Sequence, residues 1–295
     1  MTDMLIVGGL TVDRFVDGSM APGGSVLHSG LAAASDGATL TMLTVAGGEP
    51  AAREGLARLA SIGELVHQPA ASTTVYRHEE RNGIRVLVLE ARTDPISPDG
   101  LRGIERPLVA LVAPIADEVP ASLVERVVHD IAPPRVVLLI QGWLRRLVLG
   151  GEVHPLPLGA LSTEQEQVAA SADAIVVSTE DLTEAPGDPF RQAAELRRCV
   201  GPAPMVVVTL GQEGYLLDDP AADRVIASMP RRVVTDVSAN GAGDTFGAAL
   251  AVNLARGADA RTAADLATEQ VIAMLEARRR DAAPRPRPPA GREPA

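Results

Sequence analysis

The sequence predicts an α/β protein: a doubly wound, mostly parallel sheet flanked by helices, with a small β lid. Short apolar runs alternate with amphipathic stretches from one end of the chain to the other, which is the pattern of strands and helices that alternate around one sheet. Hydrophobic residues make up 46% of the chain but aromatic residues only 2%. The apolar residues are mainly Ala, Val and Leu, which suit helices packed on a buried parallel sheet. One pair of strand-like segments interrupts the alternation and predicts the lid.

The apolar runs and the amphipathic stretches give the expected elements in order. We expect strands at Met4–Gly8, Thr39–Val45, Leu108–Ala113, Arg135–Gln141, Ala174–Ser178 and Met205–Leu210. We expect helices at Ser25–Ser35, Ala51–Ser61, Pro120–Ile131, Glu164–Ala172, Pro189–Val200, Gly243–Arg256 and Ala260–Arg278. The last two helices follow one another without a strand between them.

The expected lid is a β excursion at about residues 64–91. Its two strand-like segments, Thr73–Glu80 and Ile84–Glu90, flank Asn82-Gly83, a dipeptide that favours a tight hairpin turn. A cover over a site and a plain surface hairpin both fit this pattern. At 295 residues we expect one domain over residues 1–278, which includes the lid. The Pro- and Arg-rich tail at residues 279–295 predicts disorder.

Composition excludes several classes of protein. The formal net charge is −11, which disfavours nucleic acid as a partner because such binding begins with neutralisation of phosphates. All basic residues other than histidine are Arg, and the absence of Lys, in itself the mark of a base-composition bias, excludes a P-loop lysine and a Schiff-base lysine. The single Cys199 predicts a packing residue in a reducing compartment. A strand-like start and no long apolar segment predict a cytoplasmic protein with no membrane partner.

The strongest local signal is the stretch Asn240–Gly247, which runs Asn-Gly-Ala-Gly-Asp-Thr-Phe-Gly at the start of an expected helix. Glycines before a helix let backbone N–H groups converge on an anion, and the helix dipole favours negative charge there. Asp244 stands beside this cradle, where it can accept a proton from a hydroxyl that attacks a phosphoryl group. An ordinary loop with a helix-capping aspartate is the alternative.

Three elements together resemble the ribokinase-like (PfkB-type) carbohydrate kinases over residues 3–277. They are Gly241–Phe246, a Gly-Gly pair at Gly23–Gly24, and Thr209–Gly214 after a buried strand. The resemblance implies an ATP- and Mg²⁺-dependent kinase that phosphorylates a hydroxyl of a small sugar or polyol. It further implies these roles: Asp244 as catalytic base, the amides of Gly241, Ala242 and Gly243 as anion hole, and Thr209, Gly211 and Gly214 as ATP contacts.

The same resemblance implies an acceptor site near the N-terminus and after the fourth strand. Asp13 is expected to hold substrate hydroxyls, and Gly23 and Gly24 to let the substrate approach the backbone. A solvent-facing aspartate is the alternative for Asp13. Gln141 and Arg145 follow a strand at its carboxyl end, where open α/β sheets bind ligands. For Arg145 a solvated side chain, beside a core Trp143, is the alternative.

The chain departs from the family pattern at several positions. His28 stands where the family commonly has Asn, and we count it among the substrate-binding candidates. Ser178-Thr179-Glu180-Asp181 replaces an Asn-x-x-Glu element, so Ser178 and Asp181 are expected ATP contacts, with Mg²⁺ held through ATP phosphates and water near Asp181 and no direct protein ligand. Asp236 lies further upstream of Gly241 than the family's aspartate, so a monovalent-cation site is not assumed.

The lid, the Gln-Gly-Trp element and His28 favour the inositol-kinase-like branch of the family. A nucleoside kinase and a non-catalytic sugar- or nucleotide-binding protein on the same fold are the alternatives. A homodimer through the lid is a further expectation. The other histidines lack zinc-ligand spacing, and hydrolase or dinucleotide fingerprints are absent from the sequence, so those activities are not expected.

Overall fold

The main sheet has nine strands in the order β15-β14-β13-β12-β9-β8-β1-β4-β5. We describe residues 2–81, 84–222 and 225–282 in a computed structural model. Strands β12 and β13 pair in parallel, whereas β14 and β15 are added antiparallel at one edge. The strands are β1 (Met4–Gly8), β4 (Leu40–Ala46), β5 (Glu64–Pro69), β8 (Val109–Ala113), β9 (Val136–Leu139), β12 (Ala174–Ser178), β13 (Met205–Thr209), β14 (Tyr215–Asp218) and β15 (Ile226–Ser228).

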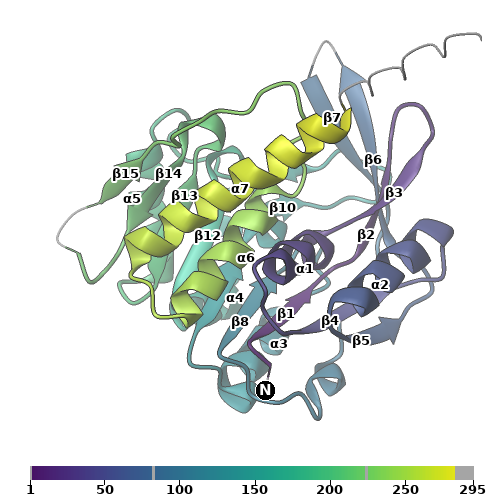
Figure 1. The fold of residues 1–295 in the computed structure, drawn as a ribbon, viewed down its shortest axis with the longest axis horizontal. Helices are drawn as coiled ribbons and strands as arrows, with labels where there is room; N and C mark the ends of the chain where they lie inside the picture. The colour runs from purple at the N-terminus through teal and green to yellow at the C-terminus, as the bar shows by residue number, and fades with distance from the viewer. Residues whose placement is uncertain (1, 82–83, 223–224, 283–295) are drawn as a thin grey trace, which may run out of the picture.

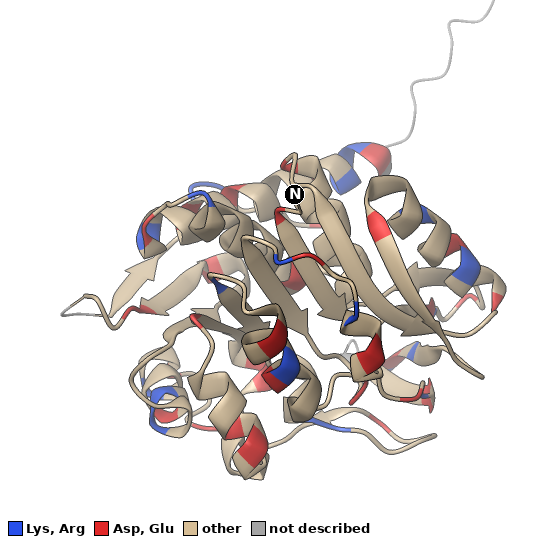
Figure 2. Cartoon of the chain, turned by 90° about the horizontal axis from the view of Figure 1, so that it is seen from below, with Lys and Arg blue, Asp and Glu red and all other residues tan. Residues whose placement is uncertain are grey.

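Helices cover both faces of this sheet, as its continuous apolar strands require. Within β1, Met4 and Ile6 join one buried cluster, and Leu5 and Val7 join a second cluster on the opposite face. The first cluster includes residues of α1 (Ser25–Ser35), α2 (Pro50–Ile62), α6 (Ala242–Ala255) and α7 (Ala260–Ala282). The second includes residues of α3 (Ala121–Arg126), α4 (Thr163–Ala170) and α5 (Pro189–Val200). Figure 1 shows α1, α6 and α7 across the near face, and Figure 2 shows charged residues around a largely uncharged sheet.

A second sheet of four strands forms the lid, in the order β3-β2-β6-β7. Its strands are β2 (Thr11–Arg14), β3 (Met20–Gly23), β6 (Thr74–Arg81) and β7 (Ile84–Ala91). The lid predicted at residues 64–91 is therefore corrected at both ends. Residues 64–69 form β5, which pairs with β4 in the main sheet and is not part of the lid. Strands β2 and β3 do belong to the lid, although in the sequence these short segments, with a Pro and glycines, resemble a loop. The Asn82-Gly83 turn lies outside the described residues.

Most expected elements are confirmed within a residue or two, and the differences lie at element ends. The expected helix Pro120–Ile131 is α-helical only to Arg126 and ends in a π-helical turn, Val127–Ile131. Helix α7 continues to Ala282, past the expected domain end at Arg278. The tail beyond Ala282 lies outside the described residues. No helix in the described ranges is long and apolar enough to span a bilayer.

The order of the strands places a topological switch point between β1 and β8. From β1 the chain continues to β4 and β5 on one side and then returns to β8 on the other. Ligands of open α/β sheets bind at the carboxyl ends of the strands at such a point. Here Ser25, the first residue of α1, donates a hydrogen bond to the carbonyl of Ala113 at the end of β8, at 2.5 Å. The start of α1 is thereby fixed at the switch point.

Candidate active site

The Gly-Ala-Gly-Asp stretch forms the N-terminus of α6. Gly241 is the residue before the helix and has a left-handed backbone, with φ at 76°, a conformation that favours glycine. Ala242 and Gly243 begin the helix. The amide of Ala242 donates to the carbonyl of Ala239 at 3.0 Å, whereas the amide of Gly243, at a helix start, has no carbonyl partner within the helix. The stretch therefore lies at the N-terminus of a long helix, where an anion is favoured, and the anion cradle stays a prediction.

Asp244 lies in the first turn of α6, and its backbone carbonyl accepts a hydrogen bond from Ser29 of α1, at 3.3 Å. Burial raises the pKa of the Asp244 carboxyl; the charges of His28 and Arg145 oppose that rise, and Asp13 adds to it. A carboxylate whose pKa is shifted toward neutrality accepts a proton more effectively than an ordinary aspartate. The groups that act on the charge of Asp244 come from three other elements.

Asp13 is buried on strand β2 with 6% of its surface exposed, so the solvent-facing alternative is wrong. Its Oδ2 accepts a hydrogen bond from Asn240 Nδ2 at 3.0 Å, and its Oδ1 lies 3.4 Å from Nε2 of His78. A Cβ on Gly23 would lie 2.8 Å from Asp13 Oδ2. A Cβ on Gly24, the residue before α1, would lie 2.3 Å from the carbonyl oxygen of Gly9. Gly23 thus lets the backbone approach the carboxylate closely, and Gly24 lets the start of α1 approach the backbone at Gly9.

The lid supplies three more side chains on the face that carries Asp13. In the register of β2 and β6, Asp13 pairs with Tyr76, and residues two apart share a face. His78 therefore faces the same side, where its ring lies 5.0 Å from that of Phe15. The hydroxyl of Tyr76 donates to the carbonyl of Ile115, and burial raises the pKa of Tyr76 to about 12. The inner face of the lid is therefore aromatic, with one carboxylate.

Gln141, Arg145 and Asp181 come together as a polar cluster after β9 and β12. Gln141 Nε2 donates to both carboxylate oxygens of Asp181 at 3.1 Å. The guanidinium of Arg145 lies 3.9 Å from Asp181, and its side chain is 13% exposed, so the solvated alternative for Arg145 is wrong. Burial raises the pKa of the Asp181 carboxyl, whereas Arg145 and Gln141 oppose the rise. Arg145 also acts on the charge of Asp244, which connects this cluster to the anion cradle.

The expected ATP contacts lie at the carboxyl ends of β12 and β13, where Ser178 and Thr209 pair in register. Thr209 Oγ1 donates to the carbonyl of Val177 at 3.4 Å. Gly211 has nothing within 4 Å of the position of a Cβ, so its surface is open to a ligand. A Cβ on Gly214, in contrast, would lie 2.0 Å from the carbonyl oxygen of Ser228. The need for glycine at 214 is therefore explained by packing against β15.

The sequence reasoning missed several residues that shape the site. Asn240 was read only as part of the glycine motif and His78 only as a scattered histidine. Arg278 donates from Nη1 to the backbone carbonyls of Ser238 and Asn240, at 2.9 and 2.6 Å, and so ties the segment before the cradle to α7. The fully buried Glu118, whose pKa burial raises, accepts hydrogen bonds from the amides of residues 115 and 116 and orders the loop after β8. An acidic pair, Asp117-Glu118, a few residues after the buried strand β8 was the available signal for Glu118.

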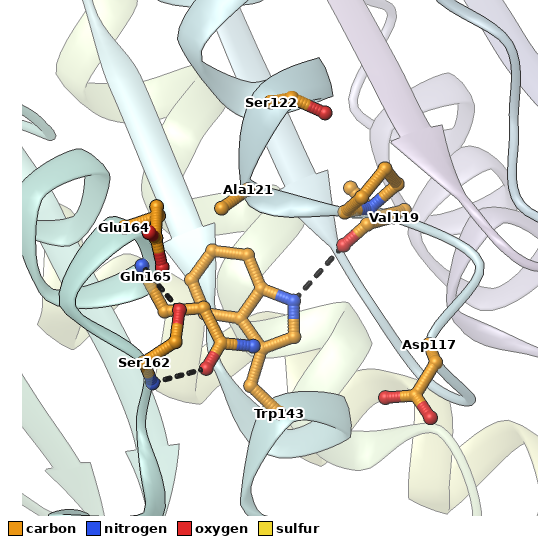
Figure 3. A pocket seen from close by; sticks show the side chains of 9 residues that line it. Asp117, Val119, Ala121, Ser122, Trp143, Ser162, Glu164 and Gln165 are labelled. Carbon is orange, nitrogen blue, oxygen red and sulfur yellow. Dashed lines mark hydrogen bonds between the residues drawn. The ribbon is translucent and has the colours of Figure 1, made fainter.

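A hollow of about 400 Å³ lies beside Trp143. The indole N–H donates to the carbonyl of Val119 at 2.9 Å, and Ser162 and Gln165 cap α4 on the opposite wall (Figure 3). Trp143 belongs to the core cluster on the α3–α5 face, as its core alternative expected. None of the predicted site residues lines this hollow.

Over residues 2–81, 84–222 and 225–282, no group of three or more acidic, His or Cys side chains is arranged to hold a metal ion. The Asp181 carboxylate already accepts from Gln141. The N-terminus of α6, where the helix dipole favours negative charge, suits a phosphate. A phosphate-bound Mg²⁺ that keeps its waters is compatible with this set.

Comparison with known proteins supports this description. The pfkB family carbohydrate kinase profile matches residues 153–284. A search of curated protein sequences gives no significant match. Among solved structures, a pyrophosphate-dependent kinase in the ribokinase family, complexed with a pyrophosphate analog and myo-inositol, matches with a TM-score of 0.77 and 18% identity, over 92% of this chain and 95% of that one.

Two further structures match at similar coverage. Arabidopsis thaliana ribokinase, complexed with ribose and ATP, has a TM-score of 0.68 and 17% identity over 93% of this chain and 99% of that one. Adenosine kinase from Schistosoma mansoni has a TM-score of 0.71 and 12% identity over 92% and 94% of the two chains.

The chain has the fold of the ribokinase-family kinases. The pfkB family model matches its C-terminal part, residues 153–284, so the resemblance predicted from the sequence is confirmed at the level of fold and partial family match.

Proposed function

We propose that the protein is an ATP-dependent kinase that transfers a phosphoryl group to a hydroxyl of a small sugar or polyol. The observation that carries this proposal is the approach of two carboxylates at the start of α6. Asn240, which directly precedes Gly241, donates to Asp13 at 3.0 Å, and Asp244 lies in the first turn of the helix that Gly241 precedes. One carboxylate to orient hydroxyls, a second to take a proton and an anion cradle between them are the parts that phosphoryl transfer needs.

The acceptor is held by Asp13 and by the backbone at Gly23 and Gly24. A carboxylate accepts hydrogen bonds from two hydroxyls of one polyol. Asn240 and His78 fix the orientation of this carboxylate through their contacts with its two oxygens. The lid lies over the acceptor and keeps water from the reacting phosphoryl group.

The donor lies from Gly211 along Ser178 and Thr209 to the cradle at the start of α6. ATP with Mg²⁺ supplies the phosphoryl group and neutralises part of its charge. Asp181 carries a partly satisfied carboxylate close to Arg145, which suits a role in ordering waters around the donor phosphates. The amides of Gly241, Ala242 and Gly243 receive the charge that develops on the transferred group.

Asp244 accepts the proton of the attacking hydroxyl as the bond from the acceptor oxygen to phosphorus forms and the bond to the leaving phosphate breaks. Because the transition state is loose, positioning and charge stabilisation contribute more than the strength of the base. His28 and Arg145 act on the charge of Asp244. Asn240 and His78 orient Asp13. Together these four side chains supply that positioning.

Pyrophosphate as donor is a second candidate. It is favoured by the match to the pyrophosphate-dependent kinase, whose TM-score of 0.77 exceeds the 0.68 of the ribokinase complexed with ATP. The same match favours a cyclic polyol as acceptor over a nucleoside. The inner face of the lid presents one exposed aromatic ring among the described residues, Phe15, and that ring already packs against His78, so a nucleobase would have a single ring to stack on.

One experiment tests the proposal and both donors. Purified protein is incubated with Mg²⁺ and either ATP or pyrophosphate, together with myo-inositol, ribose, fructose or adenosine, and ³¹P NMR follows the formation of a phosphate ester. We expect ester formation with one acceptor that is far faster than donor hydrolysis without acceptor. Tight acceptor binding by calorimetry with no ester from either donor would identify a non-catalytic binding protein instead.

A further inference from the structure

The side chain of His28 lies against the first residue of the anion cradle. His28 is in the first turn of α1. A Cβ added to Gly241 would lie 2.4 Å from Cγ and 2.6 Å from Nδ1 of the His28 ring. The imidazole therefore occupies the space that any other side chain at position 241 would need. The closeness of the ring to Gly241 places it beside the backbone that would bind a phosphoryl group.

The Nε2 atom of His28 is buried, and in the part of the chain that the structure describes it has no hydrogen-bond partner. Burial of a polar nitrogen without a hydrogen-bond partner is unfavourable. Such a group in a folded protein needs an explanation. A bound ligand that accepts a hydrogen bond from Nε2 would remove the cost.

The charges of the site show which kind of ligand fits. Asp13 and Asp244 are both negative, and the attacked phosphoryl group adds further negative charge. Among the described residues, the cationic groups that act on Asp244 are His28 and Arg145, and the chain has no Lys. Arg145 is shared with Asp181 and Tyr76. Unlike Arg145, His28 has a ring nitrogen, Nε2, without a hydrogen-bond partner in the described residues, and this atom can donate to a phosphoryl oxygen.

We propose that His28 is a second catalytic residue: its Nε2–H donates a hydrogen bond to an oxygen of the transferred phosphoryl group and completes the anion hole with the amides of Gly241, Ala242 and Gly243. This inference rests on the proposed phosphoryl transfer. The proton of the acceptor still goes to Asp244, and the proton on Nε2 stays in place throughout. His28 therefore contributes charge stabilisation rather than acid–base chemistry.

The test measures anion binding without turnover. Calorimetry with inorganic pyrophosphate compares the native protein with His28→Ala, with His28→Gln, whose amide can still donate, and with the control His129→Ala, an exposed position on the opposite face. We expect the dissociation constant to rise about tenfold in His28→Ala, as for loss of a charge-assisted hydrogen bond. His28→Gln should recover part of the affinity, and His129→Ala should bind as the native protein does.

A second background separates a contact with the anion from an effect on Asp244. The same His28→Ala change is made in Asp244→Asn. A direct contact predicts the same loss of pyrophosphate affinity in both backgrounds, whereas a loss that disappears in Asp244→Asn would show that His28 acts only through Asp244 and would overturn the proposal. Unaltered binding in folded His28→Ala, or no pyrophosphate binding by the native protein, would overturn it as well. Weakened binding without ester formation by any variant would instead refute the kinase proposal alone.

Turnover gives an independent readout with the acceptor found in the donor and acceptor panel. His28→Ala should lower kcat while the KM for the acceptor changes less than twofold, since the lost bond forms to the phosphoryl group. A rise in acceptor KM at constant kcat would place His28 in the acceptor site and contradict the proposal.

Discussion

Replacement of Gly241 by Ala tests the contact between the anion cradle and His28. The backbone at Gly241 has φ at 76°, and a left-handed conformation costs an L-residue about 1–2 kcal/mol. The reduced entropy of the unfolded chain returns about 0.4–1 kcal/mol. The new Cβ would lie 2.4 Å from His28 Cγ, well inside the contact distance of about 3.5–4.0 Å. Such overpacking costs about 1–3 kcal/mol more.

The expected total is therefore about 2–4 kcal/mol, which for a protein of this size lowers Tm by roughly 5 °C or more. The matched control is Gly257→Ala: its φ of +87° is also left-handed, but nothing lies within 4 Å of its Cβ position. Gly257→Ala should lose only the backbone contribution, about 1 kcal/mol. Thermal or urea unfolding measures both variants.

A double-mutant cycle isolates the steric part. His28→Ala empties the space that the new Cβ needs, so Gly241→Ala should cost about 1–3 kcal/mol less in the His28→Ala background than alone. If Gly241→Ala destabilises no more than Gly257→Ala, or if the two changes are additive, the ring does not pack on Gly241 and the reasoning fails.

Three other predictions follow from the same contacts. Arg278→Gln removes two hydrogen bonds to the segment before the cradle, so we expect a loss of about 1–2 kcal/mol in unfolding free energy and a higher donor KM, while an unchanged KM would separate α7 from the donor site. His78→Ala removes the lid contact with Asp13, so the acceptor KM should rise several-fold with donor affinity unaltered; equal effects on both would contradict a lid specific to the acceptor. Because burial raises the pKa of Asp244, its ionised form costs stability at neutral pH, a cost that fades as pH falls through the raised pKa toward the ordinary value of about 3.9. Asp244→Asn should therefore raise Tm at pH 7, with a gain that shrinks as the pH is lowered to about 4; a gain independent of pH would refute the assignment.

Much of the fold could be predicted because its elements carry strong local signals. Strands such as Met4–Gly8 are continuous apolar runs, and helices such as Ser25–Ser35 and Pro189–Val200 have clear periodicity, so their observed bounds match the prediction. Strands β2 and β3 could not be found in this way. Strand β2 is stabilised by pairing with β6, a segment some sixty residues away, and β3 by pairing with β2. No local pattern reports the pairing of β2 with β6.

The candidate site divides in the same way. Asp244 and the glycines before it lie in one contiguous motif whose chemistry is local, so they could be named from the sequence. The contact of Asn240 with Asp13 joins residues 227 positions apart, and Arg278 reaches the same loop from the last turns of α7. These contacts exist only after α6 and α7 have packed beside the lid, which is why sequence reasoning missed them.

The measurement that tests the central claim most directly is phosphoryl transfer by Asp244→Asn. Asn keeps the size of the side chain but cannot take a proton, so ester formation on the best acceptor should fall at least about a hundredfold, while calorimetry still detects pyrophosphate or ATP binding. Near-native transfer by a folded Asp244→Asn variant would show that Asp244 is not the base and would contradict the account.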